Sequence, residues 1–228
     1  MNKRDRGILY GMLFGDGNLH LPKGQVTYSF TMGHSPKQGS YLEHKVGLLH
    51  SIFGGKRPVV SSYDSRNKQT NKVYTNLQTR KTHNYFNQMH RVVYKTGVKR
   101  FTKQALDYLT DQGLALWFAD DGSGVVCKNK KGGLCGCMVR IATYCSKEEA
   151  EIIKTWFETT YQLSPVFDVD KRNNLYSIRF KTVDSKKFAE IVSPHLPDCM
   201  KYKVDQVISY VTRVQDAPPV KTEGEDIV

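Results

Sequence analysis

Residues 114–122 read LALWFADDG, and residues 9–17 read LYGMLFGDG. Each stretch places apolar and small residues before an Asp-Gly pair, which neither strand alternation nor an ordinary amphipathic helix explains. A helix that is apolar nearly all round is typically a buried one. We therefore expect two buried helices, each ending in a carboxylate: Asp16 in the first copy and Asp121 in the second.

The segments that follow the two stretches repeat as well. In both halves a strand, turn and strand pattern leads into a helical pattern, then two more strand patterns and a further helix. Each half then reaches a basic cluster at a matched distance. The separation is 83 residues from Asp16 to Lys99 and 82 residues from Asp121 to Lys203.

This order, α-β-β-α-β-β-α twice, predicts an α+β fold of two pseudo-symmetric repeats with antiparallel sheets. A chain of 228 residues can form two domains of about 110 residues each. We expect an N-terminal repeat at residues 1–100, a linker at 101–112 and a C-terminal repeat at 113–214. The acidic, APP-containing segment 215–228 is expected to be a disordered tail.

Two similar halves need a joint, and a pair formed by the two buried helices would supply it. Small residues at i and i+4 share one side of a helix and let two backbones approach closely. We therefore predict that the interface between the helices contains Gly11, Gly15, Ala115 and Ala119.

The charge of the chain points to a polyanionic partner. The formal net charge is +12, and the rest of the chain carries +15 because the tail contributes −3. Nucleic acid is the first candidate for such a partner. The alternative is a merely soluble basic protein, since 39% hydrophobic and 25% charged residues are ordinary for a globular domain.

Membrane and export classes are disfavoured. No apolar run approaches the roughly 18 residues that a spanning helix needs. The apolar N-terminal stretch is broken by glycines and ends on an acid, which is unlike a signal peptide. We expect no membrane partner and a location in a bacterial or phage-host cytoplasm or an organelle matrix, without secretion.

Four of the five cysteines lie close together in the sequence. Four thiolates can hold a structural zinc ion, but this spacing lacks the C-x2-C pairs that shape such sites. We favour reduced thiols packed in or near a hairpin over a zinc site. The four are Cys127, Cys135, Cys137 and Cys145.

The two acids would meet at the C-terminal ends of paired helices. That end of a helix is already negative, and two neighbouring carboxylates repel each other. A divalent cation relieves both problems, and a few oxygen ligands with open positions suit Mg²⁺. Metal-bound acids beside a phosphate are suited to phosphodiester hydrolysis. Each acid could instead be a turn residue before glycine, but the duplication in a basic chain favours the metal site.

The two stretches resemble the two LAGLIDADG motifs of homing endonucleases. They are most similar to single-chain, two-repeat members whose second copy ends in Trp-Phe-x-Asp-Asp-Gly. The resemblance extends from about residue 6 to about residue 210. It implies that the eighth motif position, Asp16 and Asp121, binds metal, while Asp120 at the usually small seventh position is a neighbour only. It also implies one catalytic basic residue per half, by position Lys99 and Lys203.

The family resemblance implies a fold and an activity. Each half would contribute a curved antiparallel sheet, and the two would form a saddle over the major groove of double-stranded DNA. A monomer using Mg²⁺ and no organic cofactor would cut both strands of a long asymmetric target, leaving short 3′ overhangs. The implied role is to copy an intron or mobile element into that target. Two alternatives use the same fold: a maturase that binds group I intron RNA, and a catalytically silent DNA-binding repressor.

Two strand patterns carry faces suited to reading DNA. Between residues 72 and 80, Val73 and Thr75 belong to the inward set, and the outward set carries amides, a phenol and cations. Near residue 178 the outward set includes Ser177. A solvated sheet face is polar in any case, but the excess of cations and amides over acids favours DNA. Lysines near the turns suit phosphates better than bases. The candidates are Lys23, Lys72, Tyr74, Asn76, Gln78, Arg80, Lys128, Lys130, Lys131, Arg140, Arg179 and Lys181.

Overall fold

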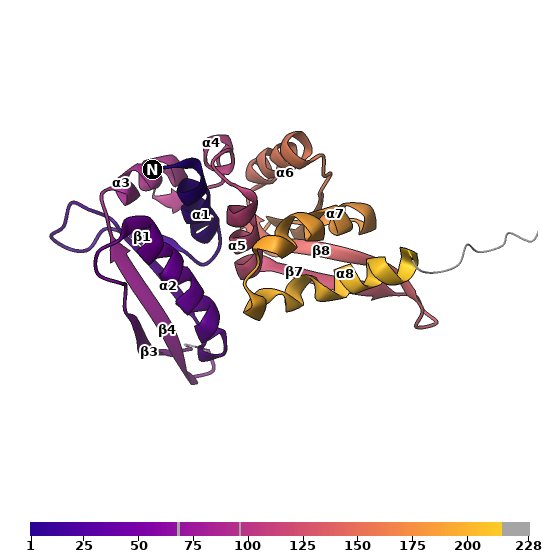
Figure 1. Ribbon diagram of the computed structural model, residues 1–228, viewed down its shortest axis with the longest axis horizontal. Coiled ribbons are helices and arrows are strands. Elements are labelled where there is room, and N and C mark those ends of the chain that lie inside the picture. The colour runs from indigo at the N-terminus through magenta and orange to yellow at the C-terminus, as the bar shows by residue number, and fades with distance from the viewer. Residues whose placement is uncertain (68, 96, 216–228) are drawn as a thin grey trace, which may run out of the picture.

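A computed structural model describes residues 1–67, 69–95 and 97–215, and Figure 1 shows its two halves side by side. The elements of the first half are α1 (Lys3–Phe14), β1 (Asn18–His20), β2 (Ser29–His34), α2 (Gly39–Phe53), β3 (Val60–Arg66), β4 (Val73–Thr82) and α3 (Tyr85–Val93). Those of the second half are α5 (Asp111–Asp121), β7 (Gly122–Lys128), β8 (Leu134–Cys145), α6 (Lys147–Tyr161), β9 (Val166–Asp170), β10 (Leu175–Phe180) and α7 (Thr182–Val192). The predicted α+β repeat order is confirmed in both halves.

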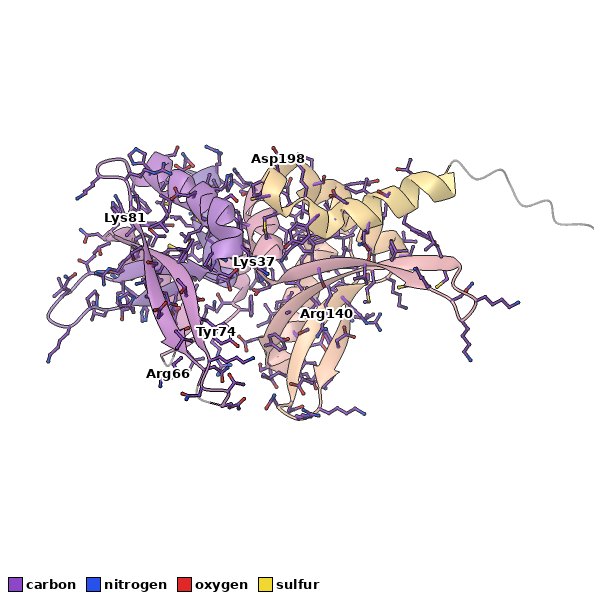
Figure 2. The ribbon with its side chains drawn as sticks, turned by 90° about the horizontal axis from the view of Figure 1, so that it is seen from below. Lys37, Arg66, Tyr74, Lys81, Arg140 and Asp198 are labelled. Atoms are coloured by element: carbon purple, nitrogen blue, oxygen red, sulfur yellow. The ribbon has the colours of Figure 1, made fainter. Side chains whose placement is uncertain are left out.

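The two sheets have the same topology. Their strand orders are β1-β2-β4-β3 and β7-β8-β10-β9, with every neighbouring pair antiparallel. Helix α2 packs on the first sheet, and α6 and α7 pack on the second. The opposite faces stay open, as Figure 2 shows from below, with Tyr74 on one sheet and Arg140 on the other. An open face on each half is what the predicted DNA-binding surface requires.

Helices α1 and α5 form the joint. Both are apolar nearly all round and buried, as their sequences predict. A Cβ atom added to Gly11 would overlap the backbone of Gly113, and one added to Gly15 would overlap the side chain of Asp120. On α5 the close approach is therefore made by Gly113 and Asp120. The expected interface role of Ala115 stays a prediction, and this residue lies about 200° around the helix from Gly113.

Its companion Ala119 is one position, about 100°, away from Asp120, and its role in the interface also stays a prediction. Both alanines are nevertheless fully buried. The spacing rule chose small residues correctly on α1 but overlooked the glycine near the start of α5. That glycine, Gly113, follows the N-cap Thr110, whose hydroxyl accepts its backbone N–H at 3.3 Å.

The two halves end differently. The first closes with a short hairpin, and the second with a long helix that packs on β7 and was not predicted. Gly124 makes room for it, because a Cβ atom there would meet the backbone oxygen of Lys203. The linker 101–112 also contains one helical turn. These additional elements are β5 (Tyr94–Lys95), β6 (Val98–Lys99), α4 (Lys103–Leu106), α8 (Tyr202–Gln215) and the 3-10 turns Pro36–Gln38, Ser193–His195 and Asp198–Met200.

The predicted tail, residues 215–228, lies outside the described residues except for Gln215, the last residue of α8. The predicted domain boundaries remain predictions. No helix within the described part of the chain is both long enough and apolar enough to cross a bilayer.

Two details of the strand patterns differ from expectation. Val73 and Thr75, expected to face inward, are exposed, because this end of the β3–β4 hairpin runs beyond the core. In β10 the pairing with β8 shifts register between Tyr176 and Ile178, and Ser177 is buried instead of facing outward. A β-bulge inserts an extra residue and so breaks the alternation on which the prediction relied.

Candidate active site

The C-terminal ends of α1 and α5 bring the two predicted acids into one region. The side chain of Asp16 is 44% exposed, whereas Asp121 is partly buried. Burial raises the pKa of Asp16, and the charge of Asp120 raises it further. Burial also raises the pKa of Asp121, to about 7, with added contributions from the charges of Asp120 and Asp16. The region therefore concentrates carboxylates that are costly to ionise together.

The two predicted lysines also reach these helix ends. Lys99, from β6, donates to the backbone oxygens of Leu13 at 3.0 Å, Gly15 at 2.9 Å and Gly17 at 3.3 Å. Lys203, from the first turn of α8, donates to the backbone oxygen of Asp120 at 3.1 Å. Cations at these carbonyls offset the negative ends of the helices. Burial lowers the pKa of both ammonium groups.

Sequence reasoning missed a buried network beside Asp16. The side chains of Lys45 and Asp120 are both 0% exposed, and the Lys45 Nζ lies 2.6 and 2.8 Å from the two Asp120 oxygens. Lys45 Nζ also lies 3.0 Å from His34 Nε2, and His34 Nδ1 lies 3.4 Å from Asp16 Oδ2. Burial, reinforced by the charge of Lys45, lowers the pKa of His34 to about 4, so this imidazole is neutral.

Patterns in the sequence could have revealed two of these residues. Lys45 falls within the apolar stripe of α2, between Leu42 and Leu49, where a cation needs a buried anion. His34 shares the inward face of β2 with Phe30 and Met32 by simple alternation. Neither pattern could name Asp120, on the other half, as the partner.

Of the groups around the acids, the exposed carboxylate of Asp16 suits a hard divalent cation, whereas Lys45 already contacts both Asp120 and His34. Asp16, His34 and Asp120 each offer a ligand atom, and these atoms lie within 4.8 Å of one another. Asp121 is outside that group, although its charge couples to that of Asp16. Carboxylate oxygens are the ligands that Mg²⁺ prefers, whereas a histidine ligand is more typical of transition metals.

The cysteines do not gather in this way. Cys137 and Cys145 are buried, Cys127 is partly buried, and Cys135 and Cys199 are exposed. Among the described residues, no three of these thiols lie close enough together to share a metal ion.

The open face of the first sheet carries several predicted DNA contacts. Tyr74, Gln78 and Arg80 are exposed, and Tyr74 is visible on this face in Figure 2. Gln78 and Arg80 line a hollow of about 650 Å³ together with the cations Lys56 and Arg57. Sequence reasoning missed these last two, although they lie in a basic segment between α2 and β3. With Lys81, the hollow thus combines an amide with four cations.

The open face of the second sheet is organised by an acid. Asp168 lies 2.7 Å from Arg179 Nε through its Oδ1 and 3.6 Å from Arg140 Nε through its Oδ2. Both predicted arginines therefore approach one carboxylate on the face where Figure 2 labels Arg140. Asp168 was not predicted, because an acid runs against the charge expected on a DNA-binding face.

The remaining predicted contacts lie at the margins of the sheets. Asn76 is partly buried and donates to Ser65 Oγ at 2.7 Å and to the backbone oxygen of Tyr74 at 3.2 Å. Lys181 caps the start of α7 and so lies just outside β10. The exposed lysines in or beside the turns are Lys23, Lys72, Lys128, Lys130 and Lys131.

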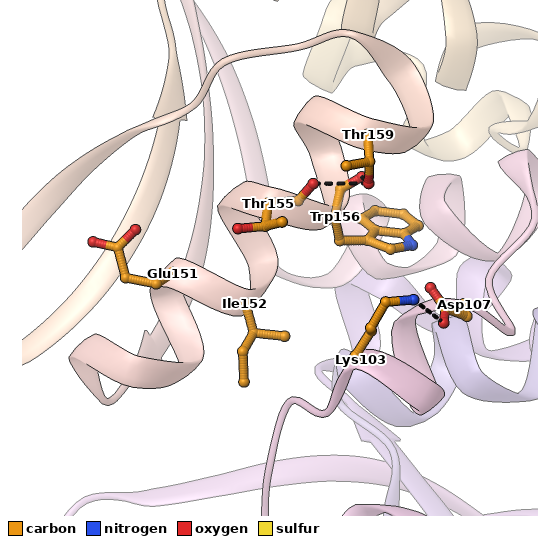
Figure 3. Close-up of a pocket in the computed structure, with 7 residues that line it drawn as sticks. All are labelled: Lys103, Asp107, Glu151, Ile152, Thr155, Trp156 and Thr159. Atoms are coloured by element: carbon orange, nitrogen blue, oxygen red, sulfur yellow. Dashed lines mark hydrogen bonds and ion pairs between the residues drawn. The ribbon is translucent and has the colours of Figure 1, made fainter.

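A separate hollow of about 280 Å³ lies between α4 and α6, as Figure 3 shows. Ile152 and Trp156 line it, and Lys103 and Asp107 form an ion pair of 2.6 Å beside them. It shares no residue with the helix ends that carry Asp16 and Asp121.

Comparison with known proteins agrees with this arrangement. The sequence profile of the LAGLIDADG DNA endonuclease family matches residues 6–188. DNA endonuclease I-ChuI of Chlamydomonas applanata is 26% identical over 211 residues, covering 90% of this chain and 95% of that protein. Cytochrome b mRNA maturase bI2 of Saccharomyces cerevisiae is 25% identical over 214 residues, covering 90% of this chain and 48% of the maturase.

Among solved structures, the homing endonuclease I-WcaI bound to its DNA recognition sequence has a TM-score of 0.74 at 22% identity. The match covers 89% of this chain and 86% of that structure, and it supports the shared fold. Because the family profile spans most of the sequence, this chain belongs to the LAGLIDADG DNA endonuclease family.

Proposed function

We propose that this chain is a monomeric, site-specific homing endonuclease that cuts both strands of a long, asymmetric DNA target. The observation that carries the proposal is the placement of two acids, Asp16 and Asp121, at equivalent helix ends between two open sheet faces. Two non-identical halves in one chain suit a target without internal symmetry.

The metal requirement rests on the acids. Asp16 and Asp121 would hold one or more divalent cations, with Mg²⁺ as the first choice. Burial and the charge of Asp120 raise the pKa of both carboxylates, and a bound cation would offset that cost of ionisation. A bound ion supplies Lewis acidity and a nucleophilic water at neutral pH. The carboxylates themselves orient that chemistry beside the scissile phosphates.

The two lysines at the helix ends would act through their positive charge. Lys99 has three hydrogen bonds to carbonyl oxygens and fixes the end of α1. Lys203 has one such bond to a carbonyl, so two of its three donors remain for water or for a phosphate oxygen. Both ammonium groups would stabilise negative charge that develops on the phosphate during hydrolysis.

The open faces would read the target. Arg80 and Gln78 on the first sheet, and Arg140 and Arg179 on the second, carry the donors that pair with guanine and adenine edges in the major groove. The turn lysines would contact phosphates and set the register of the protein on DNA. Binding should then weaken steeply as salt rises.

The test uses purified protein, Mg²⁺ and a randomised double-stranded DNA library. New ends are ligated to adapters and sequenced, with Asp16→Asn and Asp121→Asn run in parallel. We expect recurrent ends that share a flanking sequence and that both substitutions abolish. Binding of the selected target in Ca²⁺ should persist in both variants. Absence of recurrent ends from the wild-type protein would refute the proposal.

The similarity to an mRNA maturase favours one second candidate, RNA binding in group I intron splicing. In that case structured intron RNA would be bound and the two acids would be dispensable. A silent DNA-binding repressor would likewise tolerate both substitutions. Tight RNA binding with unchanged splicing in Asp121→Asn would move the assignment to the maturase.

A further inference from the structure

The buried ion pair between Lys45 and Asp120 joins the two halves. Lys45 belongs to α2 of the first half, and Asp120 is the penultimate residue of α5 in the second. Both side chains are fully buried, and the Lys45 Nζ contacts both carboxylate oxygens at 2.6 and 2.8 Å. Such a pair is strongly destabilising to break but adds little net stability over apolar residues. The buried pair is therefore expected to have a role other than stabilising the fold.

The Asp120 carboxylate also holds the backbone of Asp16. Its Oδ2 accepts the Asp16 backbone N–H at 3.0 Å. This contact is possible because Gly15 has no side chain, since a Cβ atom there would overlap the carboxylate. Asp120 Oδ2 accepts hydrogen bonds from the Asp16 backbone N–H and from Lys45 Nζ, and Oδ1 accepts one from Lys45 Nζ. Both carboxylate oxygens are therefore already occupied by donors of the protein.

His34 approaches the carboxylate of Asp16. An ammonium can only donate hydrogen bonds, so His34 Nε2 accepts from Lys45 at 3.0 Å. The ring proton is consequently on Nδ1, which lies 3.4 Å from Asp16 Oδ2. Asp16 is thus approached at its main chain by Asp120 and at its carboxylate by His34, with Lys45 linking the two.

The second acid has no such support. Among the described residues, no side chain forms a hydrogen bond with the Asp121 carboxylate. The residue facing Asp120 in the other motif is Gly15, which has no side chain to offer. The two helix ends also differ in backbone, because Asp121 is the last residue of α5 whereas α1 ends at Phe14, two residues before Asp16. The two acids are therefore held in different ways.

We propose that Asp120 is a positioning residue for Asp16, anchored by Lys45 and His34, and that the two acids are thereby held unequally and cut the two DNA strands at unequal rates. The inference rests on the proposed endonuclease function. Asp120 acts through the Asp16 backbone and does not itself touch the reacting atoms.

The test separates the hydrogen bond from the ion pair. Replacing Asp120 alone would leave Lys45 buried without an anion, and the protein could fail to fold. Both test variants therefore carry Lys45→Met, which keeps the volume and removes the charge. One adds Asp120→Leu, which has no acceptor. The other adds Asp120→Asn, whose amide oxygen can still accept the Asp16 N–H.

Three measurements are made on both double variants. Thermal unfolding and DNA binding in Ca²⁺ check folding and recognition. Hydrogen exchange at the Asp16 amide, without metal or DNA, reads the hydrogen bond directly. Single-turnover cleavage in Mg²⁺, on DNA labelled separately on each strand, reads its consequence.

We expect Asp16 to exchange about tenfold faster in the leucine variant than in the asparagine variant. Cleavage should fall by about 10- to 100-fold in the leucine variant, more on one strand than on the other, and the asparagine variant should recover most of it. Equal exchange in the two variants, equal cleavage by both, or an equal loss on the two strands would overturn the inference. Failure of the proposed function is a different result, because the wild-type protein would then cut neither strand.

Discussion

The ends of α1 and α5 occupy equivalent places in the two halves, but their surroundings differ. The first acid, Asp16, is approached by Asp120 from the second half and by His34 from its own. Asp121 has no such side-chain partner among the described residues. The lysines differ as well, since Lys99 donates to three carbonyls and Lys203 to one. A duplicated backbone can thus carry an unsymmetrical set of interactions, and each half here is completed by the other.

The largest effect should follow from breaking the cross-half ion pair. Lys45→Met leaves the Asp120 carboxylate buried without a cation, which should cost about 3–5 kcal/mol in the free energy of unfolding. Urea unfolding monitored by circular dichroism measures it. Lys103→Met is the matched control, because its ion pair with Asp107 lies at the surface and should have little effect. Comparable losses for the two variants would contradict the importance of the buried pair.

The next effect concerns the crossing of the two helices. Gly11→Ala places a methyl group against the backbone of Gly113, and overpacking there should cost about 2–3 kcal/mol. The change should also reduce cleavage, because the ends of both helices would move. Gly47→Ala, on α2 with no atom close to the added Cβ, should instead stabilise by about 0.5–1 kcal/mol. If Gly11→Ala unfolded at the wild-type urea concentration, the close approach of α1 and α5 would be disproved.

A smaller difference should separate the two lysines. Lys99→Met removes three hydrogen bonds to carbonyl oxygens, whereas Lys203→Met removes one. We expect Lys99→Met to destabilise by about 1–2 kcal/mol more than Lys203→Met. Equilibrium unfolding of both variants side by side gives this number. A larger loss for Lys203→Met would reverse the comparison between the halves.

The smallest expected effect concerns the reactivity of the cysteine thiols, all of which lie in the second half. Burial raises the pKa of Cys145 to about 11, so its thiolate fraction at pH 8 is about a thousandth. Exposed Cys135 and Cys199 should therefore react with iodoacetamide first, and Cys145 only when β8 opens. Labelling in the Lys45→Met, Asp120→Leu variant should match the wild type if the change stays at the join. Faster labelling of Cys145 there would show that the second half has loosened.

Much of this arrangement was readable from the sequence. Paired apolar motifs, hairpins and matched spacings predicted two αββαββα repeats with Asp16 and Asp121 at the ends of paired helices, and the family resemblance added Lys99 and Lys203. These signals are local or periodic, so a single pattern suffices to recognise each. Helix α8 was not predicted, because the elements matched between the two halves end at Lys203.

The network beside Asp16 could not be derived in the same way. Lys45 in an apolar stripe predicts only that some buried anion exists. Identifying Asp120 as that anion requires knowing that α2 packs near the end of α5, a contact between residues 75 positions apart. The bulge that buries Ser177 is equally non-local, since it arises from the pairing of β10 with β8.

The ion pair between Lys45 and Asp120 also determines which halves can associate. Suppose that the chain were divided within residues 101–112 and the two pieces were mixed. Two copies of the first piece would bury Lys45 with no acid, because Gly15 would face Gly15 across the joint. Two copies of the second would bring Asp120 against Asp120. Only the mixed pair satisfies both charges, so we expect neither piece to form a stable pair with itself.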